Sequence, residues 1–342
     1  MAESKIEWTG RSDWNPIRGC TRISPGCGGP GPHGGCYAEA IAGRFSDPGQ
    51  AFHGFATRTT AGPRWTGNVE IQWDRLTLPL RWREPALIFA SSTSDFFHEA
   101  LPMGEVAQLF GVMIAAHHLR GHTFQVLTKR PQRMRNWLND PEFWDVANAE
   151  AGMHVIERVD ALNRRSDDAR ATCRDDYGPD LPPPGIWLGT SVEDQQRADD
   201  RRAALIATPA AVRFVSYEPA LGPVDWAGWE FVDQIIGGGE SGPRARPMHP
   251  DWQRDTRDWC AETGIAYFFK QWGEWAPGEC ANDAVTRTEQ TADWDGKEWS
   301  YSSITPRQAE ELRYDDEPDV YRLGKRRAGR RLDGVQHDGM PS

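Results

Sequence analysis

The stretch IWLGTSVED, residues 186–194, joins a short apolar run to a polar cluster that follows it directly. The run, residues 186–189, is apolar on both faces of an extended chain, which is typical of a strand buried inside a parallel sheet. Hydroxyl and carboxylate side chains then stand where such a strand would end, and these are groups that can hydrogen-bond a ligand. The stretch predicts a buried strand with a candidate site at its carboxyl end.

The same pattern recurs along the chain, with segments of helical spacing between the apolar runs. The predicted strands are residues 86–90, 124–127, 186–189, 212–215, 232–236 and 265–269, and the predicted helices are residues 103–118, 131–147, 196–208 and 250–263. Strands that alternate with helices indicate an α/β fold with right-handed crossovers. We expect a partial or complete parallel (β/α) barrel, whose active site lies at the carboxyl ends of the strands.

The part of the chain in which strands and helices alternate defines the expected domain boundaries. We expect the barrel to occupy residues 1–275, with an insertion near 150–185 that is polar and ends in a proline-rich run. Residues 276–342 show no clear alternation and are expected to form an irregular C-terminal extension. Hydrophobic residues make up 38% of the chain, which is enough for a packed core and excludes global disorder.

Charge and hydropathy limit the cellular compartments and the binding partners that we expect for this protein. The chain has no apolar run long enough to cross a membrane and no signal-like start, so we expect a cytoplasmic protein without a membrane partner. In that reducing compartment its six cysteines are thiols or metal ligands rather than disulfides. A net charge of −11 argues against coating nucleic acid by charge alone, although basic clusters at 129–135 and 325–331 allow a local groove.

The strongest chemical signal is a group of three cysteines near the N-terminus. Cys20, Cys27 and Cys36 form the pattern C-x6-C-x8-C in a loop rich in glycine and proline. Three thiolates without a fourth suit a soft metal centre that keeps one coordination position open. Two other interpretations remain at this point: a structural zinc site completed by His33, and buried thiols that bind no metal.

Several strings along residues 8–275 resemble a phage-associated family of three-cysteine proteins of unknown function that is related to radical S-adenosylmethionine enzymes. The matching strings are WNPIRGC at 14–20, SPGC at 24–27, CYAE at 36–39, SDFFH at 94–98, LTKRP at 127–131, LGTSVED at 188–194, FVSYEP at 214–219, GGESG at 238–242 and FKQWG at 269–273. The family's second cysteine interval is C-x2-C, so the interval here carries extra residues within 28–35.

The resemblance implies a barrel of the radical S-adenosylmethionine type in which the three cysteines hold a [4Fe-4S] cluster. The open iron would bind S-adenosylmethionine, and an electron donor such as flavodoxin or ferredoxin would supply the electron that produces a 5′-deoxyadenosyl radical. The phage association implies a nucleobase substrate, in DNA or as a nucleotide, modified in the host cytoplasm. A non-catalytic, zinc-stabilised protein that binds nucleic acid or a partner is the alternative, and a metal-independent hydrolase ranks last.

Polar residues at the predicted strand ends are the candidates for the other roles. Tyr37 follows the last cysteine and is a candidate for the cofactor's adenine, while hydroxyls and carboxylates could bind its methionyl group or ribose. The same residues at 91–95 and 190–194 could equally be helix caps or strand-end turns. The cofactor-binding candidates are Tyr37, Ser91, Ser92, Asp95, Thr190, Ser191 and Glu193.

The remaining strand-end residues are assigned to the substrate. Lysine and arginine can hold a carboxylate or phosphate, and carboxylates can bind an amine or move a proton. The substrate-binding candidates are Lys129, Arg130, Ser241 and Gln271, and the catalytic candidates are Glu218, Glu240 and Lys270. Stacking on a base or on adenine is possible for Trp8, Trp14, Trp272 and Trp275, although most of the 16 tryptophans must belong to the core.

Overall fold

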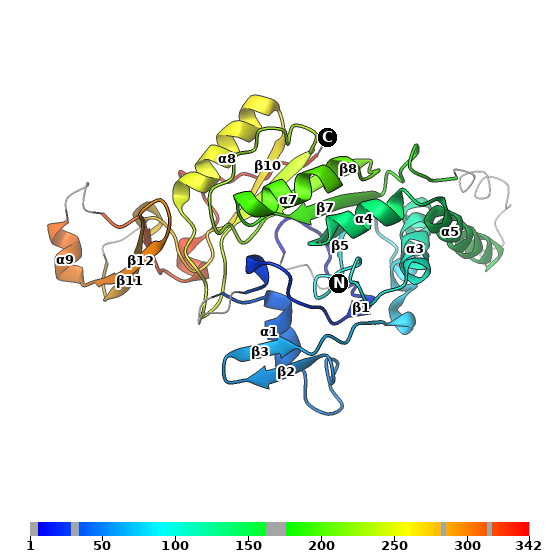
Figure 1. Cartoon of the computed structure of the whole chain (residues 1–342), viewed down its shortest axis with the longest axis horizontal. Coiled ribbons are helices and arrows are strands. Elements are labelled where there is room, and N and C mark those ends of the chain that lie inside the picture. The colour runs from blue at the N-terminus through cyan, green and yellow to red at the C-terminus, as the bar shows by residue number, and fades with distance from the viewer. Residues whose placement is uncertain (1–5, 29–33, 162–175, 282–284, 313–316, 342) are drawn as a thin grey trace. The chain divides into compact units, whose positions relative to one another are not determined.

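The computed structural model describes residues 6–28, 34–161, 176–281, 285–312 and 317–341 (Figure 1). The chain divides into two compact units. The first unit consists of Met1–Ile23, Tyr37–Thr190 and Arg201–Phe214, and the second consists of Ser24–Cys36, Ser191–Asp200 and Val215–Ser342. The boundary predicted near residue 275 stays a prediction.

The predicted strands form one sheet whose hydrogen-bonded order is β10-β9-β8-β7-β6-β5. The pairings β5–β6, β6–β7 and β9–β10 are parallel. The strands are β5 (Leu87–Ala90), β6 (Thr123–Thr128), β7 (Ile186–Ser191), β8 (Val212–Tyr217), β9 (Gln234–Gly238) and β10 (Ala266–Gln271). Because the order is open, with β5 and β10 at its two ends, the expected α/β fold is confirmed as a partial barrel rather than a complete one.

Short antiparallel pairs precede this sheet in the first unit. Strand β1 pairs with β4, and β2 forms a hairpin with β3. Their bounds are Ile17–Arg18 for β1, Ala56–Thr59 for β2, Gly62–Trp65 for β3 and Glu70–Ile71 for β4. Helix α1 (Tyr37–Arg44) and helix α2 (Leu78–Arg81) belong to the same region, as does the 3₁₀ turn η2 (Trp73–Arg75).

The predicted helices are present, with one difference. They are α3 (Met103–Arg120), α4 (Pro131–Leu138), α5 (Pro141–Ala161), α7 (Gln195–Ile206) and α8 (Pro250–Thr263). The single helix expected over 131–147 is wrong: it is divided into α4 and α5, because Pro141 has no amide hydrogen to continue the helical hydrogen bonds and stands instead at the start of α5. Helix α5 runs on to Ala161, into the expected insertion, and residues 162–175 lie outside the described residues.

Aromatic side chains hold the helices of the first unit together. Helix α3 lies beside α5 (Figure 1), and Phe110 of α3 packs against Phe143 of α5 with ring centroids 5.0 Å apart. Both rings are fully buried, and nearly all of the middle of α3 is buried as well. This packing fixes the helices against which the strand ends of β5 and β6 are positioned.

The expectation of an irregular C-terminal extension is wrong. Residues 289–321 contain a three-stranded antiparallel sheet in the order β12-β11-β13. The elements of this part are η3 (Gly278–Ala281), β11 (Glu289–Trp294), β12 (Trp299–Ile304), α9 (Pro306–Glu311), β13 (Val320–Tyr321) and α10 (Lys325–Ala328). The capping box of α9, made by Thr305 and Gln308, shows that even this short helix has a defined start.

Residues near the C-terminus cover the outer edge of β10. The amide of Phe269 donates to the carbonyl of His337 at 2.9 Å, the amide of Gly339 donates to the carbonyl of Tyr267 at 2.9 Å, and Asp338 pairs with Phe268. Because β10 ends the sheet order, its backbone groups would otherwise form an unpaired edge that could recruit another strand.

We expect Gly339→Ala to destabilise the protein by about 1–3 kcal/mol, the usual cost of overpacking. A Cβ atom at this position would lie 2.7 Å from the backbone nitrogen and oxygen of Tyr267, so the paired segment must move. Urea unfolding measures the change. The matched control is Gly152→Ala in α5, where a Cβ meets nothing within 4 Å and the free energy of unfolding should rise slightly. Equal effects at the two positions would contradict the pairing.

Three consecutive glycines, 237–239, at the end of β9 have a structural explanation. A Cβ on Gly237 would lie 2.0 Å from Oε1 of Gln253, one on Gly238 would lie 2.7 Å from Oε1 of Glu218, and one on Gly239 would lie 2.0 Å from the carbonyl oxygen of Trp272. The close approach that these glycines permit is therefore made by the protein's own atoms.

Candidate functional site

Cys20 in the first unit lies in the segment that follows β1. Its neighbour Gly19 forms a parallel bridge with Ser94, just beyond the carboxyl end of β5. Gly19 has φ +88°, and a Cβ there would lie 1.9 Å from the carbonyl oxygen of Asn68, so only glycine fits. The Cys20 side chain is partly exposed. The local backbone thus holds the first cysteine beside the end of β5.

Arg130, predicted to bind substrate, is buried and bonded to the protein on all sides. Its Nε atom donates to Glu99 at 2.8 Å, Nη1 donates to Asp95 at 3.0 Å, and Nη2 donates to the hydroxyl of Thr21 at 2.8 Å. Only 5% of the Arg130 side chain is exposed. The guanidinium therefore connects the end of β6 with the residue that follows Cys20, which is a positioning role.

The electrostatics around Arg130 include the cysteine. Burial lowers the pKa of the Arg130 guanidinium, but the charge of Asp95, the hydrogen bond that Arg130 donates to Glu99 and the charge on Cys20 outweigh burial and raise it. The cation is permanent at any physiological pH.

Asp95, a candidate for the cofactor's ammonium group, already accepts four hydrogen bonds. Oδ1 accepts from the hydroxyl of Thr128 at 2.7 Å and from the amide of Phe97 at 2.9 Å, while Oδ2 accepts from the amide of Lys129 at 3.1 Å and from Arg130. This pattern favours the strand-end turn, one of the two interpretations of residues 91–95. Lys129 itself is partly exposed at the end of β6.

The hydroxyls after β5 differ from Asp95. Ser92 donates to the side-chain oxygen of Asn15 at 3.1 Å. Ser91 is 3% exposed, has φ +54°, and its hydroxyl has no hydrogen-bond partner in the structure. A buried hydroxyl without a partner in a sparsely populated backbone conformation marks a position that suits a ligand contact. Tyr37, another cofactor candidate in this unit, is 63% exposed at the start of α1.

An ion pair between the partly exposed Arg22 and the buried Glu39 lies in the segments of the first unit that follow the first and third of the three cysteines. The guanidinium of Arg22 donates to both carboxylate oxygens of Glu39, at 3.2 and 3.0 Å from Nε. Glu39 also accepts from the amide of Trp65 at 2.9 Å, and Arg64 approaches it at 3.9 Å. Sequence reasoning missed Arg22 and Glu39 as site residues, although both stand within three positions of a cysteine.

Cys27 in the second unit belongs to the 3₁₀ turn η1 (Pro25–Cys27) and is buried. The hydroxyl of Ser24 donates to Oε1 of Glu193 at 2.6 Å, and its oxygen lies 3.9 Å from the Cys27 sulfur. A Cβ on Gly26 would lie 2.5 Å from the same Glu193 oxygen. The buried Glu193, predicted to contact cofactor, thus supports the turn that carries Cys27.

Glu240, predicted to be catalytic, is 7% exposed and contacts the cysteine loop in the second unit both directly and through Arg246. Oε1 accepts from the amide of Gly35 at 3.0 Å, and both carboxylate oxygens accept from the guanidinium of Arg246 at 2.9 and 3.0 Å. The Nη1 atom of Arg246 donates to the carbonyl of Pro25 at 3.0 Å. Arg246 is another residue that sequence reasoning missed.

Four further candidates of the second unit form two pairs near the carboxyl ends of β8, β9 and β10. Lys270 and Glu218 form an ion pair at 3.1 Å, in which both side chains stay partly accessible. Gln271 donates to the exposed Ser241 at 2.8 Å, and its buried Oε1 has no partner. The register between β9 and β10 shifts between Phe269 and Gln271, as in a bulge that redirects side chains.

The other candidates are buried. Thr190 donates to the carbonyl of Thr128 at 2.9 Å in the first unit, and Ser191 is 3% exposed in the second. The tryptophans named as stacking candidates, Trp8, Trp14, Trp272 and Trp275, are each at most 3% exposed, so they are core residues.

The chemistry of the donor set is compatible with a soft metal. The described cysteines, which are Cys20, Cys27, Cys36, Cys260 and Cys280, form no disulfide with one another. Among the described residues no three histidine, cysteine or acidic side chains form a ready metal-binding group. Cys20 belongs to the first unit and Cys27 and Cys36 to the second. His33 and Cys173 lie outside the described residues.

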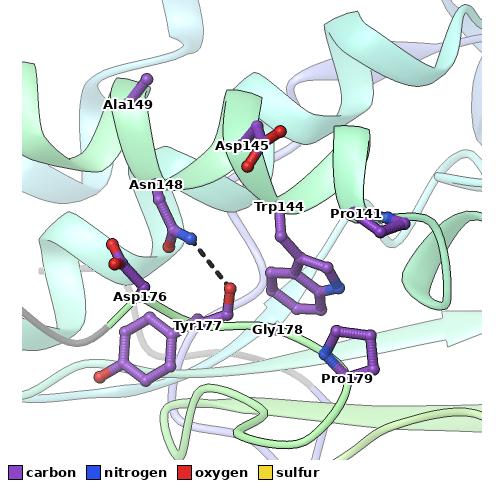
Figure 2. A pocket seen from close by; sticks show the side chains of 9 residues that line it. All are labelled: Pro141, Trp144, Asp145, Asn148, Ala149, Asp176, Tyr177, Gly178 and Pro179. Atoms are coloured by element: carbon purple, nitrogen blue, oxygen red, sulfur yellow. Dashed lines mark hydrogen bonds between the residues drawn. The ribbon is translucent and has the colours of Figure 1, made fainter.

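A separate pocket of about 510 Å³ opens on α5 in the first unit. Figure 2 shows Trp144 and Asn148 of α5 facing residues 176–179, with Asn148 donating to the carbonyl of Tyr177 at 2.9 Å. The residues that line it include none of the predicted site residues.

Within the described part of the chain, no helix is both long and apolar enough to span a membrane. A family model described as "Protein of unknown function (DUF5131)" matches residues 3–341. No curated protein and no solved structure gives a match.

Proposed function

We propose that this chain, which belongs to the DUF5131 family, is a radical S-adenosylmethionine enzyme in which Cys20, Cys27 and Cys36 hold a [4Fe-4S] cluster. The observation that carries the proposal is that arginines paired with buried carboxylates support the chain beside each of these cysteines. Partners outside the ligand shell orient metal ligands and tune a metal site, which explains why such pairs would gather here.

The three cysteines and the arginine near them are chemically suited to hold a [4Fe-4S] cluster. Three cysteines without disulfides supply three thiolates, and the cation of Arg130 lies near Cys20. When bound, a cluster with one open iron would supply reductive cleavage of S-adenosylmethionine and, through it, a 5′-deoxyadenosyl radical. The protein's own part is to position the cofactor and to exclude water from the site.

The cofactor side of the site is proposed to lie at the end of β5. The buried Ser91 hydroxyl has no partner in the structure, and Ser92 lies beside it with its hydroxyl bonded to Asn15. These hydroxyls can accept from an ammonium group or donate to a carboxylate. Asp95 is then a positioning residue that holds Arg130, and Glu193 is a positioning residue that supports the turn carrying Cys27.

The substrate is proposed to be a nucleobase, in DNA or as a nucleotide, that undergoes modification or rearrangement. The Lys270–Glu218 pair can hold and transfer a proton, and Gln271 offers an unpaired acceptor to an N–H group of the substrate. Lys129 at the end of β6 is a candidate for a phosphate, because its ammonium group is a cation that can bind one.

The test is to purify the protein without oxygen and to measure its metals and its products. We expect a brown protein with about four iron per chain, which releases 5′-deoxyadenosine when dithionite and S-adenosylmethionine are added. A colourless protein with one zinc per chain, and no 5′-deoxyadenosine, would contradict the proposal and would favour the zinc-stabilised alternative that uses His33.

A further inference from the structure

We infer that Glu39 and Glu240 are positioning residues for Cys20, Cys27 and Cys36. Each is a buried carboxylate paired with an arginine, Glu39 with Arg22 and Glu240 with Arg246, and we call each pair a clamp. Each clamp joins chain segments that lie beside two of the three cysteines. The inference rests on the proposed function, because it assigns the clamps to a metal site at Cys20, Cys27 and Cys36. It reassigns Glu240 from catalysis to positioning, and it gives Glu39 a role that the sequence did not indicate.

The Glu39 clamp joins the segments that follow the first and the third cysteine. Arg22 stands two residues after Cys20, and Glu39 stands three residues after Cys36. Their side chains form a bidentate ion pair, and the carboxylate is 2% exposed. Bidentate arginine–carboxylate pairs are stronger and more specific in geometry than single contacts. The amide of Trp65 in β3 adds a further hydrogen bond to Glu39.

The Glu240 clamp joins the segments that precede the second and the third cysteine. Gly35 is the residue before Cys36, and its amide donates to Glu240. Pro25 stands two residues before Cys27, and its carbonyl accepts from Arg246, which is itself bonded to Glu240. The amide of Gly34 also donates to the carbonyl of Arg244 at 2.5 Å. The same carboxylate–guanidinium pair therefore contacts the chain two residues before Cys27 and directly before Cys36.

This arrangement explains how the interval can be long. Eight residues separate Cys27 from Cys36, yet Pro25, just before Cys27, and Gly35, just before Cys36, are bonded to one ion pair within the second unit. Their separation is set by the Glu240–Arg246 pair rather than by the number of residues between them. The backbone of Gly34 also packs closely against this ion pair, because a Cβ on Gly34 would lie 2.7 Å from the Arg246 guanidinium.

Glu289 provides a matched control for both clamps. It is also a buried carboxylate, 4% exposed, and it is paired with two arginines: Arg287 at 3.0 Å and Arg327 at 2.6 Å. It lies in β11, far along the chain from the cysteines. Changing it to glutamine removes the same charge from the same kind of ion pair without touching the cysteine loop.

The experiment compares iron retention in Glu39→Gln, Glu240→Gln, Glu289→Gln and the wild-type chain. Each protein is reconstituted with iron and sulfide without oxygen and is then titrated with a chelator, while the visible absorbance of the cluster is followed. We expect the first two variants to hold iron about ten-fold less tightly and Glu289→Gln to match the wild-type chain. Thermal unfolding of the iron-free proteins measures the general effect of each substitution on stability.

The outcomes separate this inference from the function on which it rests. If the wild-type chain binds no iron, the proposed function fails. If it binds iron and both clamp variants retain it as tightly as Glu289→Gln, the inference is wrong. Should either glutamine variant fail to fold, Arg22→Lys and Arg246→Lys keep the charge but lose the bidentate geometry. The inference requires that they also weaken iron retention, and unchanged retention in both would overturn it.

Discussion

Replacing Cys27 by alanine is expected to remove the cluster, so that bound iron falls from about four per chain to almost none. Cys27 is one of three proposed thiolate ligands, and the proposed cluster has no spare protein ligand to replace it. Alanine is close in size to the buried thiol at this position, so the 3₁₀ turn should be retained. Cys20→Ala and Cys36→Ala should behave in the same way. Iron and acid-labile sulfide analysis after anaerobic reconstitution measures the effect.

Cys260 and Cys280 are the matched controls for this experiment. Burial raises the pKa of the Cys260 thiol to about 12, and burial together with the charge of Glu279 raises the pKa of Cys280 to about 12. Both stay protonated at neutral pH and are poor metal ligands, because the thiolate is the form that binds. Cys260→Ala and Cys280→Ala should keep the full iron content. Iron loss in these controls, or its retention in Cys27→Ala, would contradict the assignment of the ligands.

The second large effect is expected for Arg130→Met, which should lower the free energy of unfolding by about 3–5 kcal/mol. The substitution leaves the Asp95 carboxylate buried without its cation, since the two side chains are 5% and 7% exposed. It also removes the hydrogen bonds to Glu99 and Thr21. Urea unfolding of the iron-free protein measures the loss, so the result does not depend on the metal.

Two variants make this measurement specific. The double variant Arg130→Met with Asp95→Asn should recover part of the loss, because the uncompensated buried charge is gone. Arg307→Ala breaks an exposed pair, 88% and 66% exposed, and should cost less than about 0.5 kcal/mol. If Arg130→Met costs no more than Arg307→Ala, the buried network does not stabilise the end of β6 as described.

The sequence predicted the sheet well because its strands are buried on both faces. β5 to β10 each contain an apolar run that ends in polar residues, a pattern that few other structures produce. The pattern failed where burial is one-sided: most residues of β12 are exposed, so its sequence WSYSSI carries no strong alternation. It also failed at Pro141, where helical spacing continues across a residue that starts a new helix. The spacing of apolar residues indicates which face of a helix is buried, but it does not show where the helical backbone hydrogen bonds end.

The candidate site was predicted less completely, because a sequence shows the types of residues but not their partners. Arg130, Asp95 and Glu240 were expected to contact ligands, and in the structure their polar atoms contact the protein. The partner of Glu240 at Gly35 lies 205 positions away in the chain, a separation at which no spacing rule applies. Glu39 could have been found, since it is a carboxylate in the quoted string CYAE. Its importance becomes visible only through Arg22.

Electron paramagnetic resonance of the reduced protein, with and without S-adenosylmethionine, tests the central claim most directly. If three cysteines hold a four-iron cluster with one open iron, the reduced protein gives a cluster signal, and adding S-adenosylmethionine shifts that signal because the cofactor becomes a ligand. A protein that gives no cluster signal after anaerobic reconstitution, or a signal that S-adenosylmethionine leaves unchanged, would contradict the claim.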